Sequence, residues 1–510
     1  MRVGGAWQQA GGGVGRDRRS QLFAVKSAEV LLAEMAGEHR LRRVLGPVAL
    51  TALGVGAIIG AGIFVLTGLA AHDKAGPGLI LSFVVAGVGC ALAALCYAEF
   101  ASMVPVAGSA YTYAYATLGE LFAWIIGWDL VLEYAVASST VAHGWSHYFI
   151  SFLGIFGVTL PERWTSTPID IDAASHAWAV TGAYCNLPAA LVVLFVTVVL
   201  VVGIRESAGL NAAMVILKLV VVLLVIGLGS AYIRPENWHP FLPFGWGGVL
   251  SGASYVFFAY IGFDSVSTHA EEARNPQRDV PIGIIASLAL CTVLYILVAA
   301  VLTGMVPHTQ ISIDAPVAAA FASRGLPVAV FLISLGAVVG ITSVLLVLLL
   351  SQARVLLAMA RDGLIPREFF AAVHPRFRTP HKATILTGVL VATVAALFPL
   401  RILAELVNIG TLMAFVIVCA SVMVMRRTNP DLPRPFRTPL VPIVPILGMA
   451  MNFWMMCGLG RENWLRLLVW LAIGLVIYFG YGRQHSTMAQ QLAPELAVSG
   501  VVARPGGRST

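Results

Sequence analysis

Charged residues are scarce in this sequence. Asp, Glu, Lys and Arg make up 11% of its 510 residues, whereas 58% of the residues are hydrophobic. A soluble protein of this size needs more charge to cover its surface. Apolar runs of about 20 residues, the length that spans a bilayer as a helix, recur along most of the chain. The sequence therefore predicts an all-α polytopic membrane protein in contact with the lipid bilayer.

Cysteine is scarce as well, with six in the chain and no CxxC motif or cluster with histidine. The sequence therefore indicates neither a disulfide framework nor a metal site. We find no nucleophile motif and no pair of catalytic side chains, so neither an enzymatic activity nor a cofactor is expected. The basic first 45 residues have no apolar core ahead of the first apolar run, and we expect no cleavable signal peptide.

The pattern of apolar runs predicts 12 transmembrane helices. They lie at about 47–70, 78–102, 119–143, 187–204, 208–231, 248–268, 280–305, 327–351, 383–399, 402–425, 441–458 and 463–481. With the N-terminus inside, 24 of the 32 Lys and Arg residues fall in inside segments and seven in outside loops. This asymmetry follows the positive-inside rule and places both termini in the cytoplasm. The net charge of +7 thus reflects topology, and no nucleic-acid partner is expected.

The segments outside the spans have simpler compositions. Residues 1–20 are rich in Gly and Arg and are expected to form a disordered tail, as are residues 483–510. Residues 21–45 have the pattern of a cytoplasmic amphipathic segment that leads into the first span. The outside loop at about 150–186 is the longest and has room for a short helix.

The one remaining basic residue, Lys218, lies in the middle of an apolar run. A lysine at this depth costs about 2.5–3.5 kcal/mol on insertion scales, so it needs a partner or a function. It could bind a buried carboxylate or a helix end as a structural group, or it could take part in transport. Burial disfavours the charged form, so a buried lysine can lose its proton near physiological pH.

Four acidic residues also fall in or near the spans: Glu99, Asp129, Glu133 and Asp264. Asp129 and Glu133 are four residues apart and therefore share one face of a helix. Glu99 is near the inner end of its span, where a structural role is expected. Asp264 follows a glycine in the sixth span, where it could cap the inner half of a broken helix or bind a substrate.

Glycine interrupts the apolar pattern of two spans. The first span contains LGVGAIIGAGIFVLTG (residues 53–68), and in the sixth span Gly262 is followed by FDSVST (residues 263–268). Glycines spaced in this way allow close helix packing, or they allow the helix to unwind and free amide groups for a charged ligand. The two spans open two successive sets of five. Interrupted segments at matching positions indicate a transporter built from inverted repeats. The repeats would cover 46–232 and 246–425, followed by two further helices at 441–482.

Several stretches of the chain resemble one family. GVGAIIGAGIFVLTG, WDLVLEY, LNAAMVILK, FFAYIGFDSVSTHAEEARNPQRDVPIGI and RDGLIP are similar to bacterial members of the cationic amino acid transporter family. That family belongs to the amino acid–polyamine–organocation superfamily. The resemblance implies the LeuT-type fold, with 5+5 inverted repeats and broken helices 1 and 6. It also implies amino acid uptake coupled to protons, across the inner (plasma) membrane of a bacterium.

The resemblance also implies roles for particular residues. The backbone of Ile58, Ile59, Gly60, Ala61 and Gly62 would bind the substrate carboxylate. The α-amino group would be bound by carbonyl groups around Phe258, Ala259 and Ile261, with Phe258 as an aromatic gate, and by Glu133. Lys218 would stand where sodium-coupled relatives hold a sodium ion, with Thr342 and Ser343 of the eighth span close to it. A charged Lys218 would hold the first span against the eighth, and a neutral one would release them.

Other functions stay open at this point. The substrate could be a cationic or a small neutral amino acid such as alanine, because no second deep carboxylate is present to bind a cationic side chain. The chain could instead be an amino acid exchanger or a permease for a polyamine or another organic cation. A membrane amino-acid sensor would need a signalling domain, and none is visible. The sequence carries no signal for an oligomeric state.

Overall fold

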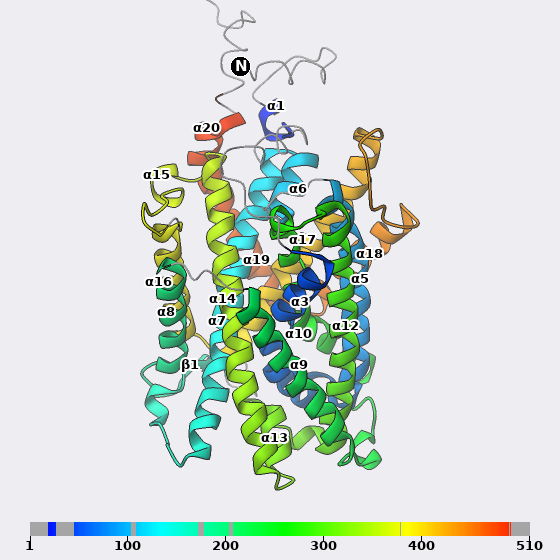
Figure 1. Ribbon diagram of the computed structural model, residues 1–510, viewed down its shortest axis with the longest axis vertical. Coiled ribbons are helices and arrows are strands. Elements are labelled where there is room, and N and C mark those ends of the chain that lie inside the picture. The colour runs from blue at the N-terminus through cyan, green and yellow to red at the C-terminus, as the bar shows by residue number, and fades with distance from the viewer. Residues whose placement is uncertain are drawn as a thin grey trace, which may run out of the picture.

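The computed structural model describes residues 19–26, 45–103, 109–171, 178–202, 208–377, 379–488 and 490. Most of residues 1–20, 21–45 and 483–510, the predicted tails and amphipathic segment, therefore lie outside the described residues. Where these segments are described, they contain two short helices, α1 (Arg19–Leu22) and α20 (Arg483–His485). The chain is thus still helical at the start of the predicted C-terminal tail. Both short helices lie at the end of the molecule that carries the N-terminus, which is predicted to be cytoplasmic and is called the inner end below (Figure 1).

Eight segments of the described chain are helical, long and apolar enough to cross a membrane. They are Gly62–Met103, Glu120–Ile155, Ala213–Ser230, Gly245–Thr268, Pro276–Met305, Pro327–Arg361, Leu400–Thr428 and Arg461–His485. Four shorter apolar helices complete the set: Pro47–Ile58, Leu187–Val202, His381–Leu397 and Ile443–Cys457. These segments lie at the predicted apolar runs, and the protein is a helical membrane protein with many spans.

The individual elements have the following bounds. The helices in these segments are α3 (Pro47–Ile58), η1 (Gly62–Leu66), α4 (Thr67–Ala70), α5 (Leu79–Met103), α7 (Glu120–Ile155), α8 (Leu187–Val202), α9 (Ala208–Ser230), α10 (Gly245–Val256), η6 (Phe257–Tyr260), α11 (Ser265–Thr268), α12 (Pro276–Met305), α14 (Pro327–Arg361), α16 (His381–Leu397), α17 (Leu400–Thr428), α18 (Ile443–Cys457) and α19 (Arg461–Ile477). Connections contain α6 (Ser109–Thr117), α13 (Pro316–Ala322) and α15 (Arg367–Phe370).

Local sequence explains where several helices begin. α3, α12 and α14 each start with a proline, Pro47, Pro276 and Pro327, which fits the first turn because its missing amide needs no acceptor there. The apolar runs then continue as helices because a backbone in lipid must bond to itself. The membrane does not set where a helix ends. α7 continues to Ile155 and α14 to Arg361, beyond the predicted ends at 143 and 351.

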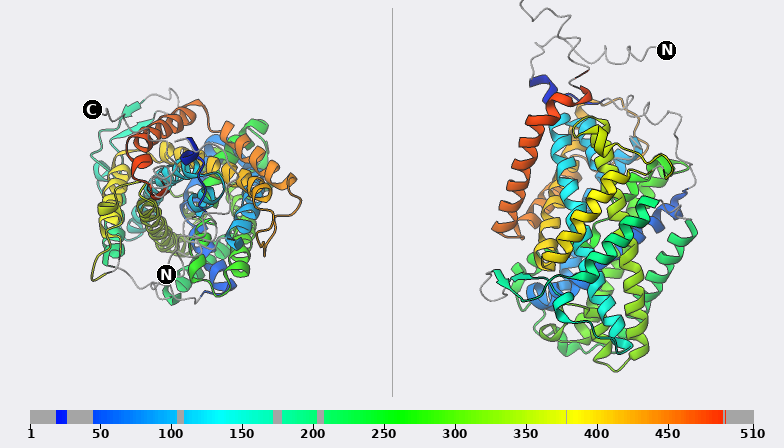
Figure 2. Two further views of the ribbon diagram at one scale, coloured as in Figure 1. Left: turned by 90° about the horizontal axis from the view of Figure 1, so that it is seen from above. Right: turned by 90° about the vertical axis from the view of Figure 1, so that its left-hand side faces the viewer.

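The broken segment α10–η6–α11 lies at the centre of the bundle. In its most apolar stretch 89% of the residues are buried, against 33% in α9 and 22% in the segment that contains α19. α7 packs along α14 and α17, and α12 packs against α3 and α5. Viewed from above, α16 and α19 lie at the periphery of the bundle (Figure 2). The breaks are therefore shielded from lipid by the helices around them.

The longest predicted outside loop, which has room for a short helix, holds a 3₁₀ turn and a small sheet in the structure. It contains a 3₁₀ turn at Glu162–Trp164 and a two-stranded antiparallel sheet of β1 (Ile169–Ile171) and β2 (Trp178–Val180). Ile169 pairs with Val180 and Ile171 with Trp178. Each strand has only three residues. An alternation of apolar and polar residues over so short a stretch cannot be recognised in the sequence.

Candidate functional site

The first interruption separates α3 from η1. α3 ends at Ile58, and Ile59 is extended with φ −72° and ψ 104°. The helix resumes as η1 at Gly62. The amide group of Gly60, which lies between the two helices, donates to no backbone carbonyl of the described residues, and the amide groups of Ala61 and Gly62 stand at the start of the second helix. Such amide groups at the start of a helix are a binding site for an anion.

The second interruption follows η6. Ile261 is extended with φ −58° and ψ 133°, and Gly262 has a φ of +120°. Only glycine adopts such an angle without strain. The short helix α11 then begins at Ser265. Gly262 is therefore required here by the backbone, as the interrupted apolar pattern of this span predicts.

The two breaks lie directly against each other. A Cβ atom built on Gly62 would lie 2.3 Å from Cα of Ala259, and one built on Gly262 would lie 2.8 Å from the carbonyl oxygen of Ala57. The contacts are with backbone or Cα atoms, which cannot move aside as a flexible side chain can. The structure thus brings the predicted residues of the first span next to Phe258, Ala259 and Ile261, and these residues are buried.

Tyrosine side chains bond to carbonyl groups at and just after the first break. Tyr295 of α12 donates from Oη to the carbonyl oxygen of Ile58 at 2.8 Å. Tyr148 of α7 donates to the carbonyl oxygen of Phe64 at 2.7 Å. Neither tyrosine was predicted from the sequence to be part of the site. The available signal was a tyrosine inside an apolar run, since a buried phenol hydroxyl needs a partner.

Lys218 extends from α9 to the broken part of the first span. Its side chain is fully buried, and Nζ donates to the carbonyl oxygen of Gly56 at 2.5 Å. A Cβ atom on Gly340 of α14 would lie 3.1 Å from Cγ of Lys218 and 3.3 Å from Cε. The lysine therefore lies between α3 and α14, as the family resemblance implies. No ion pair joins it to a carboxylate in the described chain.

The two hydroxyl residues of α14 have other partners in this structure. Ser343 Oγ donates to the carbonyl oxygen of Gly340 at 2.9 Å. Thr342 Oγ1 donates to the carbonyl oxygen of Val338 and accepts from Trp145 Nε1 at 2.9 Å. Of the hydrogen bonds formed by described residues, none joins Lys218 to Ser343. Lys218 thus meets α14 through its methylene groups at Gly340.

Asp129 and Glu133 lie on α7 and are buried. Neither carboxylate accepts a hydrogen bond of ordinary length from the described residues, and the Thr411 hydroxyl is the polar group beside Glu133. Asp129 packs against α17, where a Cβ atom on Gly410 would lie 2.7 Å from Oδ1. Glu133 is within electrostatic reach of Asp264. An unpaired buried carboxylate is costly, so this pair needs a proton or a bound cation.

Asp264 differs from these two carboxylates because both of its oxygens have partners. Tyr134 Oη of α7 donates to Oδ2 at 3.0 Å, and the amide of Gly262 donates to Oδ1 at 3.3 Å. The side chain makes no capping hydrogen bond to α11, although it stands at the N-cap position. Asp264 therefore stabilises the turn at Gly262 and ties it to α7.

Glu99 has the structural surroundings expected for it. Arg426 donates to both of its oxygens, at 3.0 and 2.7 Å. The amide of Thr438 donates at 2.8 Å, and Nε of Arg434 lies 3.4 Å away. The carboxylate thus holds α5 to the inner end of α17 and to the connection that follows it.

At the inner end, the chain before α3 pairs with the connection that follows α11. The amide of Leu45 donates to the carbonyl oxygen of Glu272 at 3.0 Å, and the amide of Arg274 donates back to Leu45 at 2.8 Å. His269 lies beside this bridge, just beyond the apolar segment. Burial, and then the nearby guanidinium of Arg354, lower the pKa of His269 to about 4, so its ring is neutral at physiological pH.

Comparisons with known proteins agree on one family. A family model described as amino acid permease matches residues 45–494. The branched-chain amino acid permease BcaP of Bacillus subtilis (strain 168) is 50% identical over 475 residues, which are 92% of this chain and 100% of that protein. The methylthioribose transporter of the same organism is 47% identical over 469 residues, 92% of this chain and 99% of that protein. Cationic amino acid transporter 4, vacuolar, of Arabidopsis thaliana is 32% identical over an alignment of 591 residues, gaps included, that covers 92% of this chain and 96% of that protein.

Proposed function

This chain belongs to the amino acid permease family, and on that premise we propose that it takes up amino acids together with protons. Membership of this transporter family confirms the predicted relationship and the absence of an enzymatic role. The observation that carries the proposal is the pair of facing helix breaks, with the amide groups of Gly60, Ala61 and Gly62 at the start of η1. Free donors beside buried acceptors suit the carboxylate and ammonium of one amino acid.

The proposed architecture has twelve membrane spans with LeuT-type inverted repeats at 46–232 and 246–425 and two further helices at 441–482. Each repeat begins with a broken helix, α3–η1 in the first and α10–η6–α11 in the second. In such transporters the substrate lies between the broken helices, and one bundle rocks against the other to alternate access. The excess of Lys and Arg on one side supports an inner (plasma) membrane location with cytoplasmic termini.

The substrate carboxylate would be bound at the first break. The amide groups of Gly60, Ala61 and Gly62 are its donors, and Ile58 and Ile59 set their direction because the helix leaves its regular path there. The positive end of the η1 helix adds favourable electrostatic energy. No side chain is needed for this contact, which suits a site that accepts different amino acids through the groups that they share.

The α-amino group would be bound on the opposite side of the site. Glu133 supplies a buried carboxylate that accepts no hydrogen bond of ordinary length in the described chain. The backbone of Phe258, Ala259 and Ile261 supplies carbonyl groups at the second break, although that of Phe258 already accepts one bond from Ile261. Phe258 is also placed to cover the site as an aromatic gate. An ammonium group would neutralise Glu133 and repay the cost of burying it.

Lys218 would couple uptake to protons, with Thr342 and Ser343 completing its surroundings on α14. In its charged form it donates to the carbonyl of Gly56, next to the break, and fixes α3 against α14. Loss of the proton weakens this charge-assisted hydrogen bond and lets the two helices separate. A proton would thus take the place of a metal ion in controlling the gate.

A neutral amino acid is the favoured substrate class. The relative that is 50% identical is a branched-chain amino acid permease. Glu133 would be occupied by the shared amino group, Asp264 is bonded to Tyr134 and Gly262, and Asp129 packs against Gly410 of α17, so we propose none of them as the partner of a cationic side chain. Methylthioribose, named for another relative, has neither an α-carboxylate nor an α-amino group. It would leave the free amides of the first break without their anion.

The test is uptake by purified protein in proteoliposomes, with and without an inward proton gradient. The panel is labelled leucine, isoleucine, valine, alanine, lysine, putrescine and methylthioribose. We expect gradient-driven accumulation of neutral amino acids. Accumulation of lysine, putrescine or methylthioribose alone would contradict the substrate class. Transport that needs an internal amino acid and ignores the gradient would identify an exchanger, and binding without transport would identify a sensor.

A further inference from the structure

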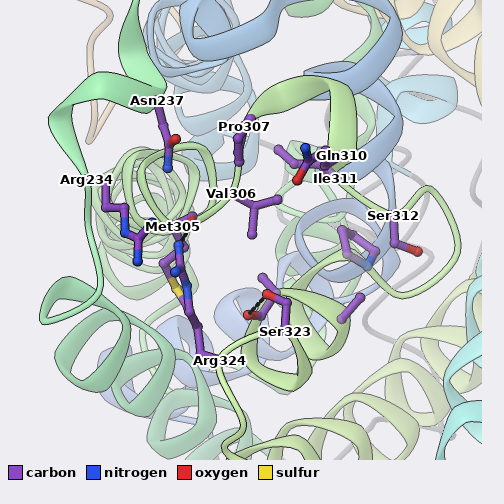
Figure 3. Close-up of a pocket in the computed structure, with 13 residues that line it drawn as sticks. Arg234, Asn237, Met305, Val306, Pro307, Gln310, Ile311, Ser312, Ser323 and Arg324 are labelled. Atoms are coloured by element: carbon purple, nitrogen blue, oxygen red, sulfur yellow. Dashed lines mark hydrogen bonds between the residues drawn. The ribbon is translucent and has the colours of Figure 1, made fainter.

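A cavity of about 330 Å³ lies at the end of the molecule opposite to the N-terminus, away from the two breaks. It is formed by the connection between α9 and α10, the outer end of α12, α13 and the turn before α14 (Figures 1 and 3). Its lining includes Arg234, Arg324, Asn237 and Gln310, together with apolar side chains such as Met305 and Val306. The cavity has a size typical of small-ligand sites.

The cavity carries two positive charges and no negative one. Its lining contains neither Asp nor Glu. Arg324 donates to the carbonyl oxygen of Met305, and its Nε atom is buried without an acceptor in the described chain. No hydrogen bond or ion pair is recorded for the Arg234 side chain within the described residues. Figure 3 shows both arginines extending toward Met305 from two sides. Two guanidinium groups that line one cavity, with no carboxylate among its lining residues, attract an anion.

The position of the cavity indicates which anion can reach it. α9 and α12 present apolar side chains outward, since Ile216, Val220 and Val293 are 61%, 54% and 55% exposed, as expected for lipid-facing positions. Tyr232 and Trp238 lie just beyond the end of α9, and Trp238 Nε1 bonds to Thr303 of α12 at 3.2 Å. Tyrosine and tryptophan are enriched at the depth of lipid headgroups. The arginines therefore lie at headgroup level on the outer side.

We propose that this cavity binds an anionic phosphate group, and that its source is the headgroup of an anionic phospholipid in the outer leaflet. Arginine matches phosphate because its planar fork forms two parallel hydrogen bonds. Asn237 is held by a 2.7 Å bond to the carbonyl oxygen of Gly304 and keeps the adjoining connection in place. The apolar lining suits the glycerol and first acyl carbons of the same lipid.

Binding at this cavity would stabilise the outer end of the transporter. Two of its lining residues, Ser312 and Pro316, also contact Gly68 of α4, in the outer half of the first broken span. A Cβ atom on Gly68 would lie 2.4 Å from the carbonyl oxygen of Ser312. A ligand that orders this wall of the cavity therefore raises the stability of the folded protein, because it binds only the folded state.

The experiment measures the thermal stability and the retained lipids of the full-length protein in detergent. The probes are phosphatidylglycerol, phosphatidylcholine and inorganic phosphate, added separately. The variants are Arg234→Gln and Arg324→Gln, with Arg163→Gln in another outside loop as the matched control. Arg234→Gln is the decisive variant, because it removes no recorded hydrogen bond of the fold. Native mass spectrometry counts bound lipid, and a melting curve reports stabilisation.

We expect phosphatidylglycerol to raise the melting temperature of the wild type and of Arg163→Gln, with roughly tenfold weaker binding to each cavity variant. Phosphatidylcholine should bind more weakly, because its choline group cancels the charge of the phosphate. Stabilisation by inorganic phosphate that depends on Arg234 would retain the anion site and assign it to a soluble ligand. Equal binding of phosphatidylglycerol to the wild type and both cavity variants, or no binding of either anion, would overturn the proposal.

Discussion

Two regions of this protein treat buried charges in opposite ways. At the inner end, Lys26 forms an ion pair with Asp362 at 3.0 Å, and Tyr111 donates to the same carboxylate at 2.7 Å. At the centre, Lys218 has a carbonyl oxygen as its partner, and Glu133 accepts no hydrogen bond of ordinary length from the described residues. Both lysines are buried, so depth alone does not explain the contrast.

The difference separates charges that hold the fold from charges that are available for transport. A buried charge with an opposite partner and further hydrogen bonds fixes two segments together, and removing one member leaves the other stranded. A buried charge without such a partner costs stability in the resting protein and is tolerated where a ligand or a proton completes it. The inner-end pairs therefore stabilise the fold, and we propose that the central groups form the transport site.

The largest expected effect on stability comes from removing one member of a buried ion pair at the inner end. Glu99→Gln should lower the free energy of unfolding by about 3–5 kcal/mol, because Arg426 and Arg434 would lose their shared carboxylate. Thermal or denaturant unfolding of the purified protein measures this, with the exposed Glu462→Gln as the control. A variant as stable as the wild type would remove the distinction between the two regions.

The contact between the breaks is the next test. Gly62→Ala should cost about 1–3 kcal/mol of stability and also reduce uptake, because its methyl group would overlap Cα of Ala259. Gly227→Ala is the matched control, since a Cβ atom there meets nothing within 4 Å. Normal stability and uptake in Gly62→Ala would mean that the breaks are not packed together during transport.

Removing a central charge should have the reverse pattern from Glu99. Glu133→Gln is expected to lower the initial rate of uptake at least about tenfold, equal to roughly 1.4 kcal/mol. Its melting temperature should stay the same or rise, because an unpaired buried charge is lost. Uptake assays and melting curves on one preparation measure both effects. A large loss of stability would show that Glu133 stabilises the fold as Glu99 does. The exposed Glu162→Gln serves as the control.

The smallest expected effect is that of Ser343→Ala. Its hydroxyl bonds to the carbonyl of Gly340 within the same helix, so its loss should change the rate of uptake by about threefold or less. The initial rate under a proton gradient measures it. A complete loss of gradient-driven uptake would show that Ser343 bonds to Lys218 in another conformation, as the family resemblance implies.

The features that could be predicted from sequence depend on local pattern. The apolar runs follow from helix length and the interruptions of the first and sixth spans from glycine position, whereas the segment Ile58–Gly62 is implied by the family resemblance. The structure has a helix or a break at each. The depth of Lys218 could be predicted for the same reason. Helix ends such as Ile155 could not, because α7 continues into the outside region without a breaking residue.

The partners of the central residues could not be predicted, because they depend on tertiary packing. Tyr295 and Ile58 are 237 residues apart in sequence, yet they share a hydrogen bond. The partners of Asp264 could not be predicted either: the structure shows no capping hydrogen bond to α11 and a hydrogen bond from Tyr134 instead. Likewise, α14 was expected next to Lys218, but only packing shows that Gly340 makes the contact.

In the proposed mechanism, Lys218 couples transport to protons. The most direct test of this coupling is accumulation of labelled leucine and alanine in proteoliposomes with an inward proton gradient, comparing the wild type with Lys218→Met. We predict that the variant stays folded and binds substrate but loses the response to the gradient. Methionine has no amino group that could gain or lose a proton and so make or break the hydrogen bond to Gly56. A folded variant that keeps full gradient-driven accumulation would contradict a coupling role for Lys218, and the coupling residue would have to be sought among Glu133, Asp264 and Glu99.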